Sequence, residues 1–307
     1  MARLDRLGEA KDVAQAAAAI GRNFVYELLA DVAGLGETAL RQALRELEAS
    51  GLVHRCGEPP SAIYTFRHAL IREIAYDSML RRRRQALHAA IASALETNFR
   101  EIVETQPDLL GRHFAQAGIE DRAIDYFERA GRRAAARSAH VEAVRHFRRA
   151  LDLIEKIEDA SPQLARKAAL WSALAPSLLV TRGYGSAEVG EAFQRADELS
   201  DKLGDPERQF YSGWGITAFR FVTGDLAGAL QMLNRLEDTA AALGQQNLRA
   251  ISLMSRGVVL FSLGRYVDSI RETERGLALY DAEQGQALGL GVGPVLRRGG
   301  GLGHGQA

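Results

Sequence analysis

The sequence is poor in several residue types, and each scarcity excludes a class of protein. Cys56 is the only cysteine in 307 residues, so the chain has neither a disulfide framework nor a cysteine zinc site. A reducing cytoplasm fits this usage. Only four of the basic residues are lysines, and none of them follows a glycine, as the Gly-Lys-Ser/Thr of a P-loop requires. Autonomous NTP hydrolysis through a P-loop is therefore excluded.

Long apolar runs and an excess of one charge are also missing. The longest uncharged apolar stretch, Ala168 to Thr181, has 14 residues and contains Pro176, whereas a membrane span needs about 18. The 39 Lys and Arg residues balance the 39 Asp and Glu residues. This balance argues against a surface that follows nucleic acid or anionic lipid along its whole length. We expect no membrane segment and no general nucleic-acid binding.

No constellation typical of catalysis or metal binding occurs in the sequence. None of the seven histidines forms the His-x-x-x-His spacing of a helical zinc site, and no Gly-x-Ser-x-Gly nucleophile elbow is present. The sequence therefore predicts a protein that is not an enzyme and carries no cofactor and no metal.

What is present is mainly helical periodicity, with one β-prone interruption. Apolar residues recur at i, i+3, i+4 spacing, and they predict helices over Lys11–Ile20, Phe24–Val32 and Glu37–Ser50. Two short β-prone runs, Leu52–Arg55 and Ala62–Phe66, flank a turn-rich cluster and predict a hairpin. Three helices followed by a two-stranded wing indicate a winged-helix domain, which we place at residues 1–98.

From Pro107 the sequence is repetitive in the manner of tetratricopeptide (TPR) units, in which small and large residues alternate where paired helices cross. When Gly118 is taken as the turn between the two helices of a unit, the residues before it match the first-helix positions and those after it match the second-helix positions. The second-helix triplet Ala123, Phe127 and Ala130 recurs 20 residues later as Ala143, Phe147 and Ala150. The predicted packing residues are Leu110, Gly111, Phe114, Ala123, Phe127, Ala130, Ala143, Phe147 and Ala150. The sequence predicts a TPR-like α-solenoid over residues 99–284, whose concave face would hold a protein or peptide.

Glycines mark the turns of further predicted helix pairs, and they then become frequent in the last residues of the sequence. Gly185, Gly224 and Gly264 recur as turn glycines, and helix pairs such as Asp225–Leu243 and Asn247–Leu263 lie between them. Nine of the 30 glycines fall in residues 285–307, which contain no Asp or Glu. We predict a disordered Gly-rich tail there.

Two polar features are candidate sites. His68 lies at the start of a helix, where free backbone N–H groups and the helix dipole suit an anion, although a packing or capping role is the alternative. The run Arg81-Arg82-Arg83-Arg84 is either a solvated helix boundary or a patch for an anionic partner. The helix Glu37–Ser50, which precedes the wing, carries three carboxylates against two arginines, a poor surface for a phosphate backbone.

These residues resemble a known family. Phe66–Glu73 and Leu80–His88 resemble the winged-helix segment of STAND-type signalling ATPases, and Gln106–Leu110 and Ala123–Phe127 resemble the TPR array that follows it. The run to about Tyr280 is similar to the C-terminal half of bacterial multidomain adenylate/guanylate cyclases that carry an AAA-like ATPase and TPRs.

The resemblance implies a regulatory module whose relatives carry a P-loop ATPase and a cyclase domain before this point. The present chain would then be a fragment or a separated regulatory half, acting on an ATPase or cyclase domain in trans. His68 matches the family histidine that contacts the β-phosphate of ADP, although Ala69 stands where the best-known motif has Asp. The alternative that the resemblance leaves open is part of a STAND-type transcriptional regulator that binds DNA or a DNA-binding partner.

Overall fold

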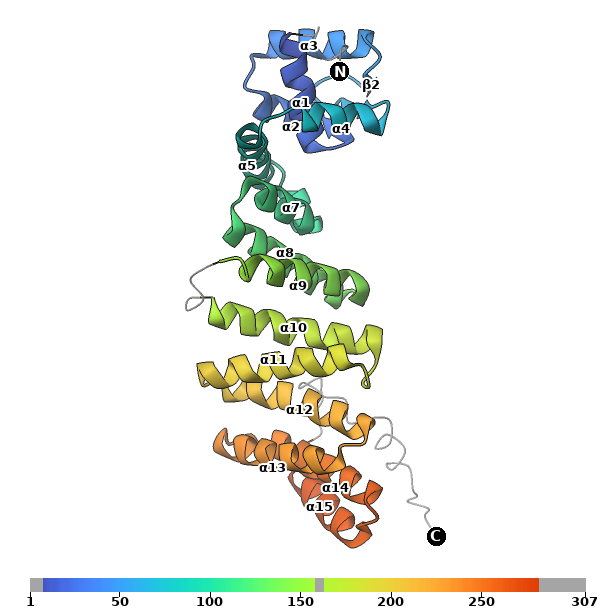
Figure 1. Cartoon of the computed structure of the whole chain (residues 1–307), viewed down its shortest axis with the longest axis vertical. Coiled ribbons are helices and arrows are strands. Elements are labelled where there is room, and N and C mark those ends of the chain that lie inside the picture. The colour runs from blue at the N-terminus through green and yellow to red at the C-terminus, as the bar shows by residue number, and fades with distance from the viewer. Residues whose placement is uncertain (1–7, 158–162, 282–307) are drawn as a thin grey trace, which may run out of the picture. The chain divides into compact units, whose positions relative to one another are not determined.

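The computed structural model describes residues 8–157 and 163–281, so the predicted tail at 285–307 lies outside the described residues. The chain forms two compact units, residues 1–158 and residues 159–307. Both are built mainly of helices, and a small sheet belongs to the first (Figure 1). The fold is therefore mainly α, as the periodicity predicts.

The first unit begins with helices around a three-stranded antiparallel sheet. Its elements are α1 (Glu9–Ile20), β1 (Asn23–Val25), α2 (Tyr26–Ala33), α3 (Glu37–Ala49), β2 (Val53–Cys56), β3 (Ile63–Phe66) and α4 (Ala69–Asp77). The predicted hairpin is present as β2 and β3, with Val53 opposite Phe66. In the sheet β3 lies between the other two strands.

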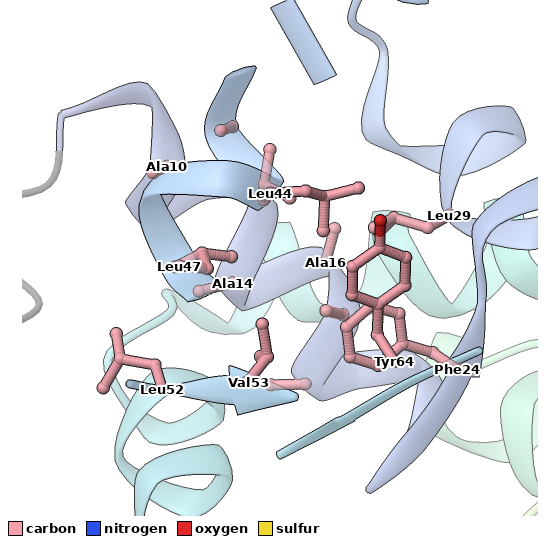
Figure 2. Packing of buried hydrophobic residues seen from close by; sticks show 14 of the residues in the cluster. Ala10, Ala14, Ala16, Phe24, Leu29, Leu44, Leu47, Leu52, Val53 and Tyr64 are labelled. Carbon is pink, nitrogen blue, oxygen red and sulfur yellow. The ribbon is translucent and has the colours of Figure 1, made fainter. Parts of the chain in front are cut away.

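The prediction of helix from Phe24 was wrong at its first residues. Phe24 lies in β1, which pairs with β3 so that Phe24 is opposite Tyr64. The two rings stack with centroids 5.6 Å apart (Figure 2). A three-residue strand has too few positions to show a period of its own, so only pairing with β3 distinguishes it from the first turn of α2.

Small residues let the helices of this part approach closely. Ala10, Ala14 and Ala16 of α1 are buried in one cluster with leucines of the neighbouring helices (Figure 2). In α3 the apolar residues at helical spacing are all buried: Leu40, Ala43, Leu44 and Leu47. The core of this region is therefore an alanine-rich helix packed against leucine-rich neighbours and the aromatic face of the sheet.

The remaining helices of the first unit follow each other in space as in sequence. They are α5 (Arg81–Asn98), α6 (Arg100–Thr105), α7 (Pro107–Ala117), α8 (Glu120–Ala136) and α9 (His140–Ile154). Helix α7 packs on α5 and on α8, and α8 packs on α9. Gly118 ends α7 in the left-handed conformation, with φ of 77°, which allows the tight turn into α8.

The second unit continues this serial packing. Its helices are α10 (Leu164–Arg182), α11 (Ala187–Leu203), α12 (Pro206–Thr223), α13 (Leu226–Ala242), α14 (Gln246–Ser262) and α15 (Tyr266–Leu279). Each helix packs on the next one along the chain. The predicted helix pair Asp225–Leu243 and Asn247–Leu263 corresponds within one residue to α13 and α14. Helices that pack mainly on their sequence neighbours are typical of a repeat architecture.

Candidate functional site

The nine predicted packing residues, which belong to α7, α8 and α9, are all buried. Two glycines explain how closely these helices approach. A Cβ atom at Gly111 would lie 3.0 Å from the Phe127 ring, and one at Gly131 would lie 2.6 Å from the Phe147 ring. Each phenylalanine thus packs against a glycine of the preceding helix, and the arrangement repeats after 20 residues. Gly131 is a packing position that the sequence comparison with TPR units did not include.

His68 stands at the N-cap position of α4 and is exposed. Its backbone carbonyl accepts a hydrogen bond from the Ile71 N–H, but its side chain makes no capping hydrogen bond. A nucleotide-sensing role for His68 remains a prediction.

The four consecutive arginines form the first turn of α5. Two of them make ion pairs with other helices, and in the described part of the chain the other two do not. Arg83 makes an ion pair with Asp12 of α1 at 2.8 Å, and Arg84 lies 3.7 Å from Asp77 at the end of α4. Arg84 also lies over the Tyr76 ring, 5.4 Å from its centroid. Arg81 and Arg82 are exposed and make no ion pair with any described residue. Of the four, Arg81 and Arg82 therefore remain available to an anionic partner. Binding of such a partner at this run is still a prediction.

A buried chain of polar rings connects α4, α5 and α7. The Tyr76 hydroxyl lies 2.8 Å from His88 Nε2, and His88 Nδ1 lies 2.9 Å from His113 Nδ1. A hydrogen bond between the two Nδ1 atoms needs one protonated nitrogen as donor and one unprotonated nitrogen as acceptor. The ring that accepts is therefore neutral. Burial lowers the pKa of His88 to about 4, helped by the nearby positive charge of Arg84.

Burial has a larger effect on the second ring, and lowers the pKa of His113 to about 3, with contributions from His88 and Arg112. Both histidines are therefore neutral at physiological pH. The sequence shows them only as isolated histidines 25 residues apart, so nothing in it indicates that they form a pair.

The second unit contains an aromatic cavity of about 350 Å³ between α10, α11 and α12. Its walls are mostly apolar, and they include Leu179, Tyr184, Phe193, Tyr211 and Trp214. Cavities of this kind, with a few polar groups among apolar side chains, are typical ligand sites. This cavity is the candidate site of the second unit.

Its polar groups come from α12 and from a proline-containing stretch of α10. Pro176 lies inside the helix and has no N–H, which removes the donor that the Ser172 carbonyl would have in a regular helix. The buried Ser172 hydroxyl has no hydrogen-bond partner among the described residues. Arg208 of α12 also lines the cavity, with Asp205 at 3.5 Å. The cavity thus offers hydrogen-bonding capacity and one cation within an aromatic wall.

Neither a metal centre nor a membrane-spanning helix occurs among the residues that the structure describes. In that part of the chain no three His, Cys, Asp or Glu side chains lie together as metal ligands. Nor does any helix there have the length and apolar character needed to span a membrane.

Comparison with known proteins gives few relatives. No family model matches the sequence. A protein of Rhizobium meliloti (strain 1021), Uncharacterized protein R02095, is 30% identical over 290 residues, which are 92% of this chain and 27% of that protein. The chain therefore spans about a quarter of the length of this relative.

The similar solved structures are distant in both sequence and geometry. The apo form of RapI has a TM-score of 0.47 and 13% identity, and the match covers 92% of this chain and 66% of that one. A STAND protein with a tetratricopeptide repeat sensor, PH0952 from Pyrococcus horikoshii, has a TM-score of 0.37 and 13% identity, with coverage of 92% and 45%. A Rap protein complexed with Competence and Sporulation Factor has a TM-score of 0.43 and 15% identity, with coverage of 91% and 66%.

Proposed function

We propose that this chain is a non-catalytic regulatory module that binds a protein or peptide through its helical repeats. The aromatic cavity between α10, α11 and α12 carries the proposal. An apolar side chain of a peptide would fill the space beside Phe193 and Trp214, and a peptide N–H would find an acceptor in the carbonyl of Ser172. Tyr and Trp are side chains on which binding energy commonly concentrates.

The finer fold assignments belong to the same proposal. A winged helix is supported by the order of α1, β1, α2, α3, β2 and β3, and by a sheet in which β3 lies between β1 and β2. A TPR-like solenoid is supported by the serial helix packing and by the glycine–phenylalanine contacts of α7, α8 and α9. The exposed free Cys56 fits a reducing cytoplasm.

Within this proposal, the partner would be an ATPase or cyclase domain acting in trans. The motif resemblance to STAND-type proteins supports this choice, with His68, Arg81 and Arg82 as the contact candidates. Size-exclusion chromatography of the chain with such a domain from the same genome tests it, and separate elution at micromolar concentrations would contradict it. Assays of ATP turnover and cyclic-nucleotide formation by the chain alone should give no activity.

The alternative, a DNA-binding regulator, has less support because the arginines of α3 are engaged within their own helix. Arg41 pairs with Glu37 at 2.6 Å, and Arg45 donates to Gln42 at 2.8 Å. Glu46 adds another exposed carboxylate to this surface. Gel shifts on duplex DNA at several salt concentrations distinguish the two functions, because phosphate binding weakens steeply with salt.

A matched pair of tyrosine variants tests the peptide site. Peptides selected from a random library against the full chain should bind Tyr184→Ala about tenfold more weakly than wild type, because Tyr184 lines the cavity. Tyr266→Ala should bind as wild type, since this tyrosine is exposed and does not line the cavity. Equal loss in both variants, or no selectable peptide, would contradict the proposal.

A further inference from the structure

A second cavity, in the first unit, differs in character from the aromatic one. It has a volume of about 480 Å³ and is lined by residues of α1, α4, α5, α7, α8 and α9. Four cationic side chains, Arg72, Arg112, Arg149 and Lys156, line it together with a single carboxylate, Asp152. The whole chain has no net charge, so this concentration of positive charge is local.

Most of this charge is not neutralised by the surrounding protein. No ion pair joins Arg72, Arg149 or Lys156 to a carboxylate of the described residues. Arg112 makes an ion pair with Asp108 at 3.3 Å, but both side chains are partly exposed. Cations gathered around one cavity repel each other, and this repulsion lowers stability unless an anion enters. Side chains arranged against stability in this way are characteristic of binding sites.

The cavity is also organised before any ligand binds. The guanidinium of Arg149 lies over the Phe127 ring, 5.6 Å from its centroid, which fixes its position. Arg112 is held at its own helix, because its Nε donates to the Asp108 carbonyl at 3.4 Å. His88 lines the wall as a neutral ring bonded to Tyr76, so it adds a polar surface without a competing negative charge.

We propose that this cavity binds a small oxyanion with two or more negative charges, such as pyrophosphate or the phosphate group of a small metabolite. Guanidinium groups bind phosphate oxygens through paired, charge-assisted hydrogen bonds, and arginine supplies three of the four cations. Arg72 comes from α4, which follows the sheet, whereas Arg112 and Arg149 come from the repeat helices α7 and α9. A bound oxyanion therefore links the sheet-containing part of the first unit to its repeats.

Isothermal titration calorimetry of the full chain tests this site, with inorganic pyrophosphate and ribose 5-phosphate as separate probes at constant ionic strength. We expect saturable binding of at least one probe. Tighter binding of pyrophosphate would identify charge as the main determinant, and tighter binding of ribose 5-phosphate would identify a contribution from the organic group. No saturable binding of either probe would overturn the proposal.

Charge-neutralising variants locate the site. Arg72→Gln should weaken binding about tenfold or more, the loss expected for one charge-assisted contact. Arg149→Gln with Lys156→Gln, at two exposed positions that tolerate substitution, should have a similar effect. Arg133→Gln with Arg137→Gln is the matched control, because these exposed arginines of the first unit do not line the cavity, and it should bind as wild type.

Thermal melting without ligand separates binding from folding. Each cavity variant should melt at or above the wild-type temperature, because the substitution relieves repulsion, yet it should lose the stabilisation that the probe gives to wild type. Loss of binding in the Arg133 and Arg137 control, or unchanged binding in both cavity variants, would overturn the assignment. The aromatic cavity lies in the other unit, so failure there leaves this result unaffected.

Discussion

Acidification should unfold the first unit before the second, because of the His88–His113 pair. All the histidines of the described residues belong to the first unit: His54, His68, His88, His113, His140 and His146. His88 and His113 are neutral in the folded state, with pKa values of about 4 and about 3 against 6.5 for an exposed histidine. Burial also lowers the pKa of His146.

The sign of the effect follows from proton uptake by the unfolded chain. Below pH 6.5 the unfolded chain protonates both histidines, whereas the folded chain does so only near pH 4 and pH 3. Stability is therefore full above pH 6.5 and decreases as the pH falls toward 4. Two protons correspond to a slope of about 2.7 kcal/mol per pH unit. Because the pair is coupled and solvent partly screens it, we expect about half that slope.

The second unit should respond differently. Burial raises the pKa of Asp197, although its ion pair with Arg235 at 2.9 Å opposes the shift. A carboxyl whose pKa is raised by folding favours the folded state as the pH falls through its titration. Acid therefore does not weaken the second unit through this residue.

Tryptophan fluorescence reports only the second unit, which makes the assay simple. Both tryptophans, Trp171 and Trp214, lie in the second unit. In urea titrations between pH 7 and pH 4.5, the helical circular-dichroism signal reports both units and should gain a component that moves to lower urea with acid, while the tryptophan transition of the second unit stays in place. Coincident transitions at every pH would refute the reasoning.

Two glutamine variants isolate the pair. His113→Gln keeps a hydrogen-bonding group beside His88 and should reduce the pH slope of the first unit by about half. His54→Gln, at an exposed strand position, should leave the slope unchanged. An unchanged slope in His113→Gln would show that other groups cause the acid sensitivity.

Two further substitutions test the packing and capping of the helices. Gly131→Ala should destabilise the first unit by about 1–3 kcal/mol in urea, because its Cβ would lie 2.6 Å from the buried Phe147 ring, whereas the control Gly185→Ala has no neighbour nearer than 3.5 Å and should be nearly neutral. Asp225→Ala should cost the second unit about 1 kcal/mol, since this N-cap carboxylate accepts a backbone N–H of α13 at 2.9 Å. The exposed Asp238→Ala is its control, and equal melting temperatures for the two aspartate variants would contradict the capping argument.

Sequence periodicity determined most of the helices, because burial of one face imposes a spacing that can be read along the chain. The apolar face of α3 and the boundaries of α13 and α14 follow from this spacing and from flanking glycines. The turn-rich segment between β2 and β3 likewise indicates a hairpin. Phe24 was misassigned because β1 exists only through its pairing with β3.

The candidate sites depended on tertiary structure. His88 and His113 form a pair only because α5 packs against α7, and the cations of the oxyanion cavity come from α4, α7 and α9 and from Lys156 just beyond α9. In the same way, α10, α11 and α12 together form the aromatic cavity around Pro176. The sequence by itself determined which residues are helical and which face is apolar, since both depend on local spacing. Which polar side chains meet is decided by how the helices pack, because no local pattern records contacts between residues far apart in the chain.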